Sequence, residues 1–166
     1  MHDILAVNTP EQIADTARLA GRIWREHYEP IIGQEQVAYM LERFQSEAAI
    51  AEQIARGQEY YLAVSERGPC GYLAVIPEAS DRSLKISKIY VRRSERGSGV
   101  GRQLLALAEQ RARELGLERL WLTVNVNNTG SIAWYEATGF VNTGPVVQDI
   151  GGGFIMDDYR FEKALA

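Results

Sequence analysis

A glycine-rich segment between a strand and an amphipathic helix is the feature that most restricts the fold of this chain. Residues Leu84 to Arg92 predict a strand, and Gly99 to Leu115 predict a helix whose apolar residues recur at helical spacing. Gly116 favours the end of that helix, and Arg119 to Val126 predict a second strand. A strand, a crossover helix and a second strand form a right-handed parallel unit in nearly all known sheets. The chain is therefore expected to contain one parallel β-α-β unit.

The elements on either side of this unit are joined mostly by short turns. Before it we predict strands at 3–7, 60–64 and 70–77 and helices from Pro10 to about His27, at 34–44 and at 46–56, with residues 28–33 breaking the first helix. After it we predict a helix at 128–138 and strands at 140–150 and 154–162 around three glycines. Strands joined by short turns are antiparallel. The predicted α/β (α+β) fold is a mixed, mostly antiparallel sheet of about seven strands flanked by helices, in one domain over residues 1–166.

Composition excludes several classes of protein. The chain has 166 residues, 46% of them apolar and 24% charged, which is ordinary globular usage. Its net charge of −4 lacks the basic excess of nucleic-acid-binding proteins. No apolar run is long enough to span a bilayer, and the first residues do not resemble a signal peptide, so we expect a cytoplasmic protein. The single cysteine, Cys70, is expected to be inert, and no cluster has the spacing of a metal site.

The residues Arg96-Gly97-Ser98-Gly99-Val100-Gly101 follow a predicted strand and open a predicted helix. Backbone N–H groups there meet the positive end of the helix dipole, so the loop is suited to an anion such as a phosphate. Arg93, Arg96 and Arg102 add positive charge nearby. A dinucleotide-binding loop needs glycine at position 102, and a Walker loop needs Gly-Lys-Ser/Thr, so neither pattern fits. A nucleotide-binding regulator is disfavoured for the same reason.

A second segment begins at Asn128, follows the strand that ends at Val126, and contains Ser131, Tyr135 and Gly139-Phe140. Asn128 is expected to cap the helix, and Tyr135 lies two turns further on. Together with the glycine-rich loop, in this order and at this spacing, the segment resembles the GNAT N-acetyltransferase superfamily. Its pattern is Arg/Gln-x-x-Gly-x-Gly/Ala after a strand, then an asparagine, a small residue, a tyrosine and Gly-Phe. Ser131 stands where alanine is commoner.

The resemblance implies acetyl-CoA as the acetyl donor. The pantetheine arm would lie along the strand that ends at Val91, and a backbone N–H near Ile89 or Tyr90 would meet the thioester carbonyl. Asn128 would touch the pantetheine or orient its helix. The pyrophosphate would lie on the backbone N–H groups of Arg96, Gly97, Ser98, Gly99, Val100 and Gly101.

The resemblance also implies an amine as the acceptor and Tyr135 as the group that protonates the departing CoA thiolate. An alkylamine is mostly protonated at neutral pH, so a base is required as well. Glu29 is the favoured candidate. Other acids considered are Glu26, beside the same helix break, and the adjacent Asp157 and Asp158, which face opposite sides of a strand. Residues considered for the acceptor pocket are Trp24, His27, Tyr28 and Tyr39.

The nature of the acceptor stays open at this point. Residues 149–159 are similar to members of the superfamily described as polyamine or general amine acetyltransferases, which favours the primary amine of a small molecule. The alternatives are an acetyltransferase acting on protein or peptide N-termini, an acyltransferase using a longer thioester, and a GNAT-like domain that senses CoA without turnover. A homodimer is expected from the resemblance alone.

Overall fold

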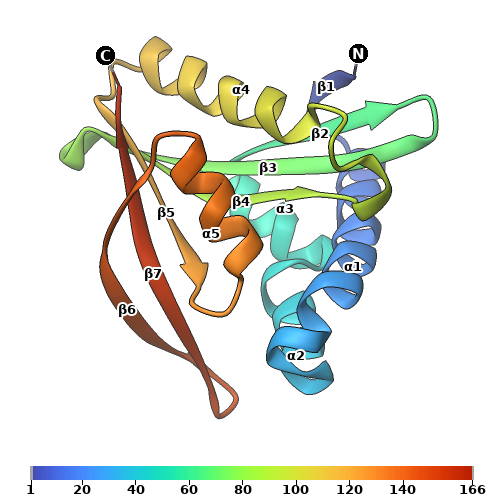
Figure 1. The fold of residues 1–166 in the computed structure, drawn as a ribbon. Helices are drawn as coiled ribbons and strands as arrows, with labels where there is room; N and C mark the ends of the chain where they lie inside the picture. The colour runs from blue at the N-terminus through green and yellow to red at the C-terminus, as the bar shows by residue number, and fades with distance from the viewer. Residues whose placement is uncertain (1, 166) are drawn as a thin grey trace. The chain divides into compact units, whose positions relative to one another are not determined.

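A computed structural model describes residues 2–165. The described chain contains seven strands, five α-helices and two short 3₁₀ turns, coloured along the chain in Figure 1. The strands are β1 (Asp3–Ala6), β2 (Glu59–Ser65), β3 (Gly68–Glu78), β4 (Ser83–Val91), β5 (Arg119–Asn125), β6 (Val141–Gly151) and β7 (Phe154–Ala164). The helices are α1 (Pro10–Ile32), α2 (Gln34–Phe44), α3 (Glu47–Ala55), α4 (Val100–Glu114) and α5 (Thr129–Ala137).

The strands form one mixed sheet in the order β1-β2-β3-β4-β5-β7-β6. Strands β4 and β5 are parallel, with Lys85 paired with Trp121, and they are connected through α4. The pairs β1–β2, β2–β3, β5–β7 and β6–β7 are antiparallel. The expected mixed sheet with one parallel β-α-β unit is therefore confirmed.

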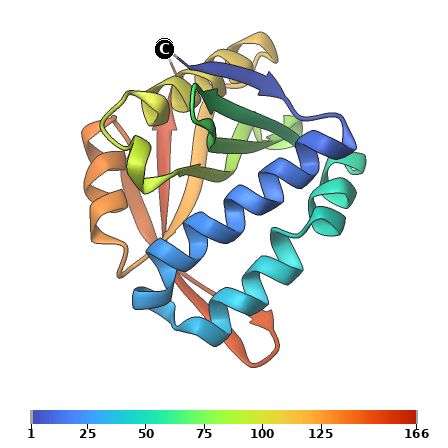
Figure 2. The same cartoon turned by 90° about the vertical axis from the view of Figure 1, so that its right-hand side faces the viewer.

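Contacts divide the described chain into two compact units, residues 2–76 with 88–107 and residues 77–87 with 108–165. The expectation of one domain over residues 1–166 stays a prediction. In the first unit, helix α1 contacts both α2 and α3, and Figure 2 shows α1 running alongside α2. The first unit is held together by fully buried side chains, among them Ile50, Tyr60, Leu62, Tyr72 and Leu73.

The second unit is built on β5, the β6–β7 hairpin and α5 (Figure 1). Along β5, Leu120, Leu122 and Val124 are buried while the residues between them are half-buried, which is the period of two expected for a strand. Phe161 of β7 is paired with Leu122 and fully buried. The unit therefore has its own apolar layer on one face of the sheet.

Helix α1 is longer than the sequence predicted. We expected residues 28–33 to break it after His27, but the helix continues to Ile32 with Pro30 inside its last turn. Proline has no N–H, so the carbonyl of Glu26, four residues earlier, loses its helical partner. That carbonyl instead accepts a hydrogen bond from Arg93 Nη2 at 3.0 Å. At the end of the helix, the Gly33 N–H donates to Glu29 O at 2.9 Å, and Gly33 adopts a φ of 88°. A tertiary hydrogen bond thus compensates for the proline.

Candidate active site

The predicted anion-binding loop lies in the first unit, between β4 and α4. Gly97 and Gly99 have φ angles of 84° and 91°, a conformation that favours glycine over residues with side chains. A Cβ atom at either position would meet nothing within 4 Å, so no side chain covers the backbone there. Helix α4 begins at Val100, and the N–H groups of a first helical turn have no intrahelical partner. The loop therefore has the uncovered glycines and the helix start that its sequence predicted, while the N–H groups of Arg96 and Ser98 donate to Arg93 O at 3.2 Å and Glu95 O at 3.3 Å.

Two arginines next to this loop contact the last turns of α1. Besides the bond from Arg93 to the carbonyl of Glu26, Arg96 Nη2 lies 3.5 Å from His27 Nδ1. Both arginine side chains are otherwise exposed. The Arg93 contact compensates for Pro30 in α1, and both contacts hold positive charge at the edge of the loop. The sequence predicted the charge but not its anchor on α1.

An aromatic cluster joins α1 to the end of β4 within the first unit. The ring of Trp24 stacks on Tyr28 with centroids 4.3 Å apart, and Tyr90 packs edge-on against Trp24 at 5.5 Å and Tyr28 at 6.0 Å. His27 packs edge-on against Tyr28 at 4.7 Å. Two of the four residues predicted for the acceptor pocket, Trp24 and Tyr28, thus meet a residue of the predicted pantetheine strand, and His27 joins the cluster through Tyr28.

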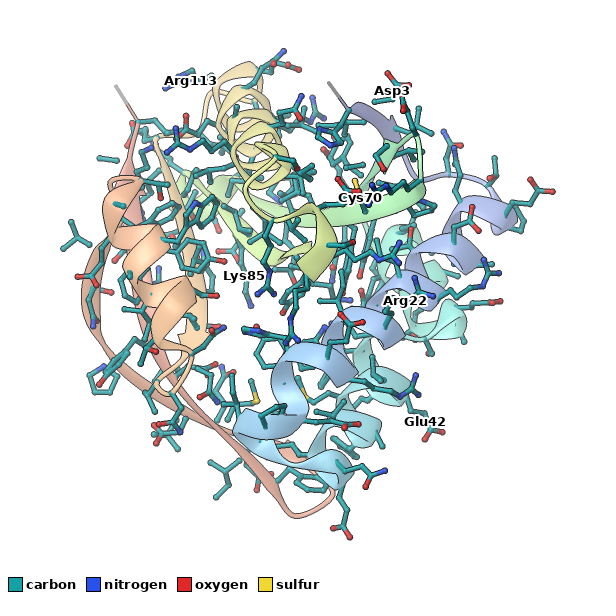
Figure 3. The ribbon with its side chains drawn as sticks, turned by 45° about the vertical axis from the view of Figure 1, so that its right-hand side comes forward. Asp3, Arg22, Glu42, Cys70, Lys85 and Arg113 are labelled. Carbon is teal, nitrogen blue, oxygen red and sulfur yellow. The ribbon has the colours of Figure 1, made fainter. Side chains whose placement is uncertain are left out.

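The predicted pantetheine strand ends with Ile89, Tyr90 and Val91. These last three residues of β4 are all half-buried. Gly71 of β3 lies directly against it, because an added Cβ at Gly71 would be 3.0 Å from the Tyr90 carbonyl oxygen. Cys70, whose sulfur is drawn in Figure 3, is buried, and desolvation raises the pKa of its thiol. Its Sγ donates to Ala63 O at 3.4 Å. A buried thiol with a raised pKa is a poor nucleophile, as expected.

Tyr135 and Asn128 lie in the second unit, on and before α5. The Tyr135 ring is buried and packs against Phe140 at 5.7 Å and Phe161 at 6.4 Å. Asn128 occupies the N-cap position, but its side chain makes no capping hydrogen bond, contrary to expectation. It is buried instead, and its carbonyl accepts the Ile132 N–H at 3.1 Å. Its backbone thus opens the helix.

The four acids considered from the sequence differ in burial. Glu26 and Asp157 are exposed, Glu29 is half-buried within α1 rather than beside a break, and Asp158 is 4% exposed. Desolvation, the largest effect, raises the pKa of Asp158 to about 6. From the sequence alone, Asp157 and Asp158 are equivalent candidates for the base. The strand register decides which of the two side chains is buried.

Four further polar or aromatic side chains lie on the same face of the second unit as Asp158 and were not singled out from the sequence: Lys85, labelled in Figure 3, Trp121, Thr123 and Arg160. The period of two along β5 placed Trp121 and Thr123 on one face, but nothing in the sequence placed Asp158 on that face, opposite Asn125. Register between strands distant in sequence is a tertiary property.

Comparison with known proteins agrees with this arrangement. The model of the GNAT acetyltransferase family matches residues 21–140. An N-acetyltransferase of Lactobacillus delbrueckii subsp. lactis is 30% identical over 138 residues, covering 79% of each chain. The streptothricin acetyltransferase of Streptomyces lavendulae is 38% identical over 85 residues, covering 51% of this chain and 45% of that protein.

Among solved structures, the PaiA N-acetyltransferase of Thermoplasma acidophilum, in complex with coenzyme A, superposes with a TM-score of 0.82 over 99% of both chains at 19% identity, which shows the shared fold. No helix among residues 2–165 is both long and apolar enough to cross a membrane. The match over most of the chain confirms the expected family and enzyme class, and acetyl-CoA is the donor that GNAT acetyltransferases use. The chain belongs to the GNAT family of N-acetyltransferases.

Proposed function

We propose that this protein transfers the acetyl group of acetyl-CoA to the primary amine of a small molecule, in a complex that holds both substrates. The observation that carries the proposal is the open, glycine-rich backbone at Gly97 and Gly99, directly before α4 and beside two anchored arginines. Backbone N–H groups of this kind bind phosphate oxygens, and acetyl-CoA carries a pyrophosphate. A small-molecule acceptor is favoured by the similarity to the streptothricin acetyltransferase.

In this proposal the residues from Arg96 to Gly101 hold the pyrophosphate. The end of β4, from Ile89 to Val91, presents its backbone to the pantetheine arm, and an N–H at Ile89 or Tyr90 stabilises the negative charge that develops on the thioester oxygen. Asn128 supports the pantetheine or the start of α5. The loop residues fit a pyrophosphate, because no side chain covers the two loop glycines and the nearby arginine side chains are positively charged.

The chemistry requires a neutral amine and a protonated leaving group. An alkylamine with a pKa near 10.4 must lose a proton before its nitrogen attacks. The Tyr135 phenol donates a proton to the departing sulfur, and its packing against Phe140 and Phe161 holds the ring in one orientation. Glu29, half-buried in the last turns of α1, is the proton acceptor that the sequence favoured.

Thiol release from acetyl-CoA tests the proposal, with spermidine, an aminoglycoside, a streptothricin-type antibiotic, free amino acids and short peptides as acceptors. The buried Cys70 contributes little background to a thiol reagent. We expect release with a small-molecule amine and a loss of about 100-fold or more in kcat with Tyr135→Phe. Tyr61→Phe is the matched control, because the Tyr61 hydroxyl donates to Glu59 at 2.8 Å on β2 and lies outside the proposed site.

Release with peptides alone would contradict the small-molecule acceptor and favour acetylation of protein N-termini. Binding of acetyl-CoA without release for any acceptor would contradict catalysis and favour a CoA-sensing domain. Equal turnover by wild type and Tyr135→Phe would contradict the role of the phenol.

A further inference from the structure

One face of the sheet in the second unit carries polar side chains instead of an apolar layer. Residues Trp121, Thr123 and Asn125 of β5 point to one side because side chains alternate along a strand. The strand register places Arg160 opposite Thr123 and Asp158 opposite Asn125. This polar face is the reverse of the one that packs on α5.

Asp158 is the unusual member of this face. Its side chain is 4% exposed, and its Oδ1 has no hydrogen-bond partner among residues 2–165. The Thr123 side chain lowers the pKa of this carboxyl, but desolvation dominates and raises the pKa to about 6. Buried carboxylates normally have partners for both oxygens, so the Asp158 Oδ1 can accept a hydrogen bond from a donor that the described chain does not supply.

The positive charges nearby do not neutralise Asp158. Lys85 Nζ lies 4.8 Å from the centroid of the Trp121 ring, and the Arg160 guanidinium lies 4.0 Å from the same centroid. Arg160 also pairs with Glu162 at 3.7 Å. No ion pair within residues 2–165 joins either cation to Asp158. Lys85 lowers the pKa of the Asp158 carboxyl only at a distance, and Asp157 raises it.

We propose that Asp158 binds the ammonium group of the acceptor through its unpartnered Oδ1 and takes the proton that must leave before the amine attacks. This inference rests on the proposed acetyl transfer and deepens it, because it assigns the acceptor side of the reaction to a buried anion. The acceptor class that follows is a cationic primary amine whose charged end can enter a confined site.

Two protons leave the nitrogen in this transfer, one before the attack and one after it. The ammonium gives the first proton to the Asp158 carboxylate, directly or through one water, and becomes a neutral amine. The nitrogen forms a bond to the thioester carbonyl carbon, the carbon–sulfur bond breaks, and the sulfur leaves with a proton from the Tyr135 phenol. The acetylated nitrogen loses its second proton, which reprotonates Tyr135. Release of the first proton from Asp158 to solvent restores the starting state.

Two other acids make weaker proton acceptors. The Asp157 side chain is exposed on the opposite face, and its backbone carbonyl accepts the Val126 N–H at 3.0 Å. Glu29 is half-buried in α1, and no unpartnered buried oxygen marks its carboxylate. A base in the ternary complex works best with a pKa raised toward neutrality, and Asp158 has that property together with its unpartnered oxygen.

The test compares Asp158→Asn with its matched neighbour Asp157→Asn, using the best acceptor of the panel, with folding checked by thermal melting. We expect Asp158→Asn to lower kcat/KM by about 100-fold or more and Asp157→Asn to stay within about threefold of wild type. The affinity for acetyl-CoA should be unchanged in both. The wild-type profile of kcat/KM should fall as pH drops below about 6, and this limb should be absent from the residual activity of Asp158→Asn but present in Asp158→Glu.

An Asp158→Asn enzyme within about threefold of wild type, with the same acid limb, would overturn the inference. A second measurement does not depend on turnover. The Asp158 carboxyl is followed by ¹³C NMR, assigned by its absence in Asp158→Asn, and titrated with and without spermidine. A bound cation should lower the titration midpoint, and an unchanged midpoint would also overturn the inference. Binding of acetyl-CoA without turnover, combined with a lowered midpoint, would contradict the proposed function but support amine binding at Asp158.

Discussion

Replacing the buried Lys88 by methionine should remove a pH dependence of stability that the wild-type protein shows above neutral pH. Lys88 is 5% exposed, and burial lowers the pKa of its ammonium from 10.5 to about 7. A shift of this size corresponds to about 5 kcal/mol at 1.36 kcal/mol per pKa unit. This is an upper value, because hydrogen bonds to the charged form oppose desolvation.

The sign of the effect follows from proton binding. Between pH 7 and 10.5 the unfolded chain holds a proton on Lys88 that the folded chain has lost, so stability rises with pH over this window. Below pH 7 both states are protonated, and the full destabilisation is present. The free energy of unfolding of wild type should therefore increase by up to about 1.4 kcal/mol per pH unit relative to Lys88→Met.

The methionine variant leaves no buried group without a partner. Lys88 Nζ donates to Phe44 O, to Tyr60 Oη and, at 3.0 Å, to Gln53 Oε1. Without the ammonium, Gln53 Nε2 still donates to Phe44 O at 3.1 Å and the Tyr60 hydroxyl still donates to Gln53 Oε1 at 2.5 Å. Lys88→Met should therefore be at least as stable as wild type at pH 7.

Urea unfolding followed by tryptophan fluorescence at several pH values from about 7 to 9.5 measures both proteins. Burial raises the pKa of the Cys70 thiol, but this contribution is common to both proteins and cancels in their difference. A stability difference between wild type and Lys88→Met that stays constant across this range would refute the reasoning.

Further predictions concern backbone and capping positions. Gly71→Ala should destabilise the protein by about 1–3 kcal/mol, because its Cβ would be 3.0 Å from the Tyr90 carbonyl oxygen. The same substitution should weaken acetyl-CoA binding. Thermal melting measures the loss of stability, and calorimetry measures the loss of affinity. Gly130→Ala, in α5 with nothing within 4 Å of the added Cβ, is the matched control and should gain up to about 1 kcal/mol. Thr9→Ala should lose about 1 kcal/mol in urea unfolding, because it removes the capping box between Thr9 and Gln12. An unchanged midpoint for Gly71→Ala or Thr9→Ala would contradict the assigned contact.

Much of the fold could be predicted because its determinants are local. The period of two along β5 and the amphipathic spacing of α4 are visible in single segments, and the strand–helix–strand order fixes the parallel pairing of β4 and β5. The end of α1 could not be predicted, because Pro30 is tolerated through a hydrogen bond from Arg93, which is distant in sequence. The capping role expected of the Asn128 side chain also failed, since that side chain is buried.

The same distinction applies to the candidate site. A phosphate-binding loop is made of consecutive backbone groups, so Gly97 and Gly99 can be identified from one short stretch of the sequence. An acceptor site is made of single side chains from separate strands. Asp158 is recognised only once β5 and β7 are in register, because the sequence alone does not say which of two adjacent acids is buried.

Lys88 and Asp158 are both buried charges, but their surroundings differ in a way that separates a structural role from a functional one. Three acceptors surround the Lys88 ammonium, whereas one oxygen of Asp158 has no partner within the described chain.

The pKa of Asp158 rises from 3.8 to about 6, so its ionised form destabilises the fold by about 3 kcal/mol above pH 6 and not below about pH 4. Asp158→Asn should therefore be more stable than wild type at pH 7, with the gain disappearing on acidification, while acetyl transfer is lost. Stability sacrificed at an active site produces this combination. Urea unfolding at both pH values measures the gain, and a variant less stable than wild type at pH 7 would show that the carboxylate serves the fold.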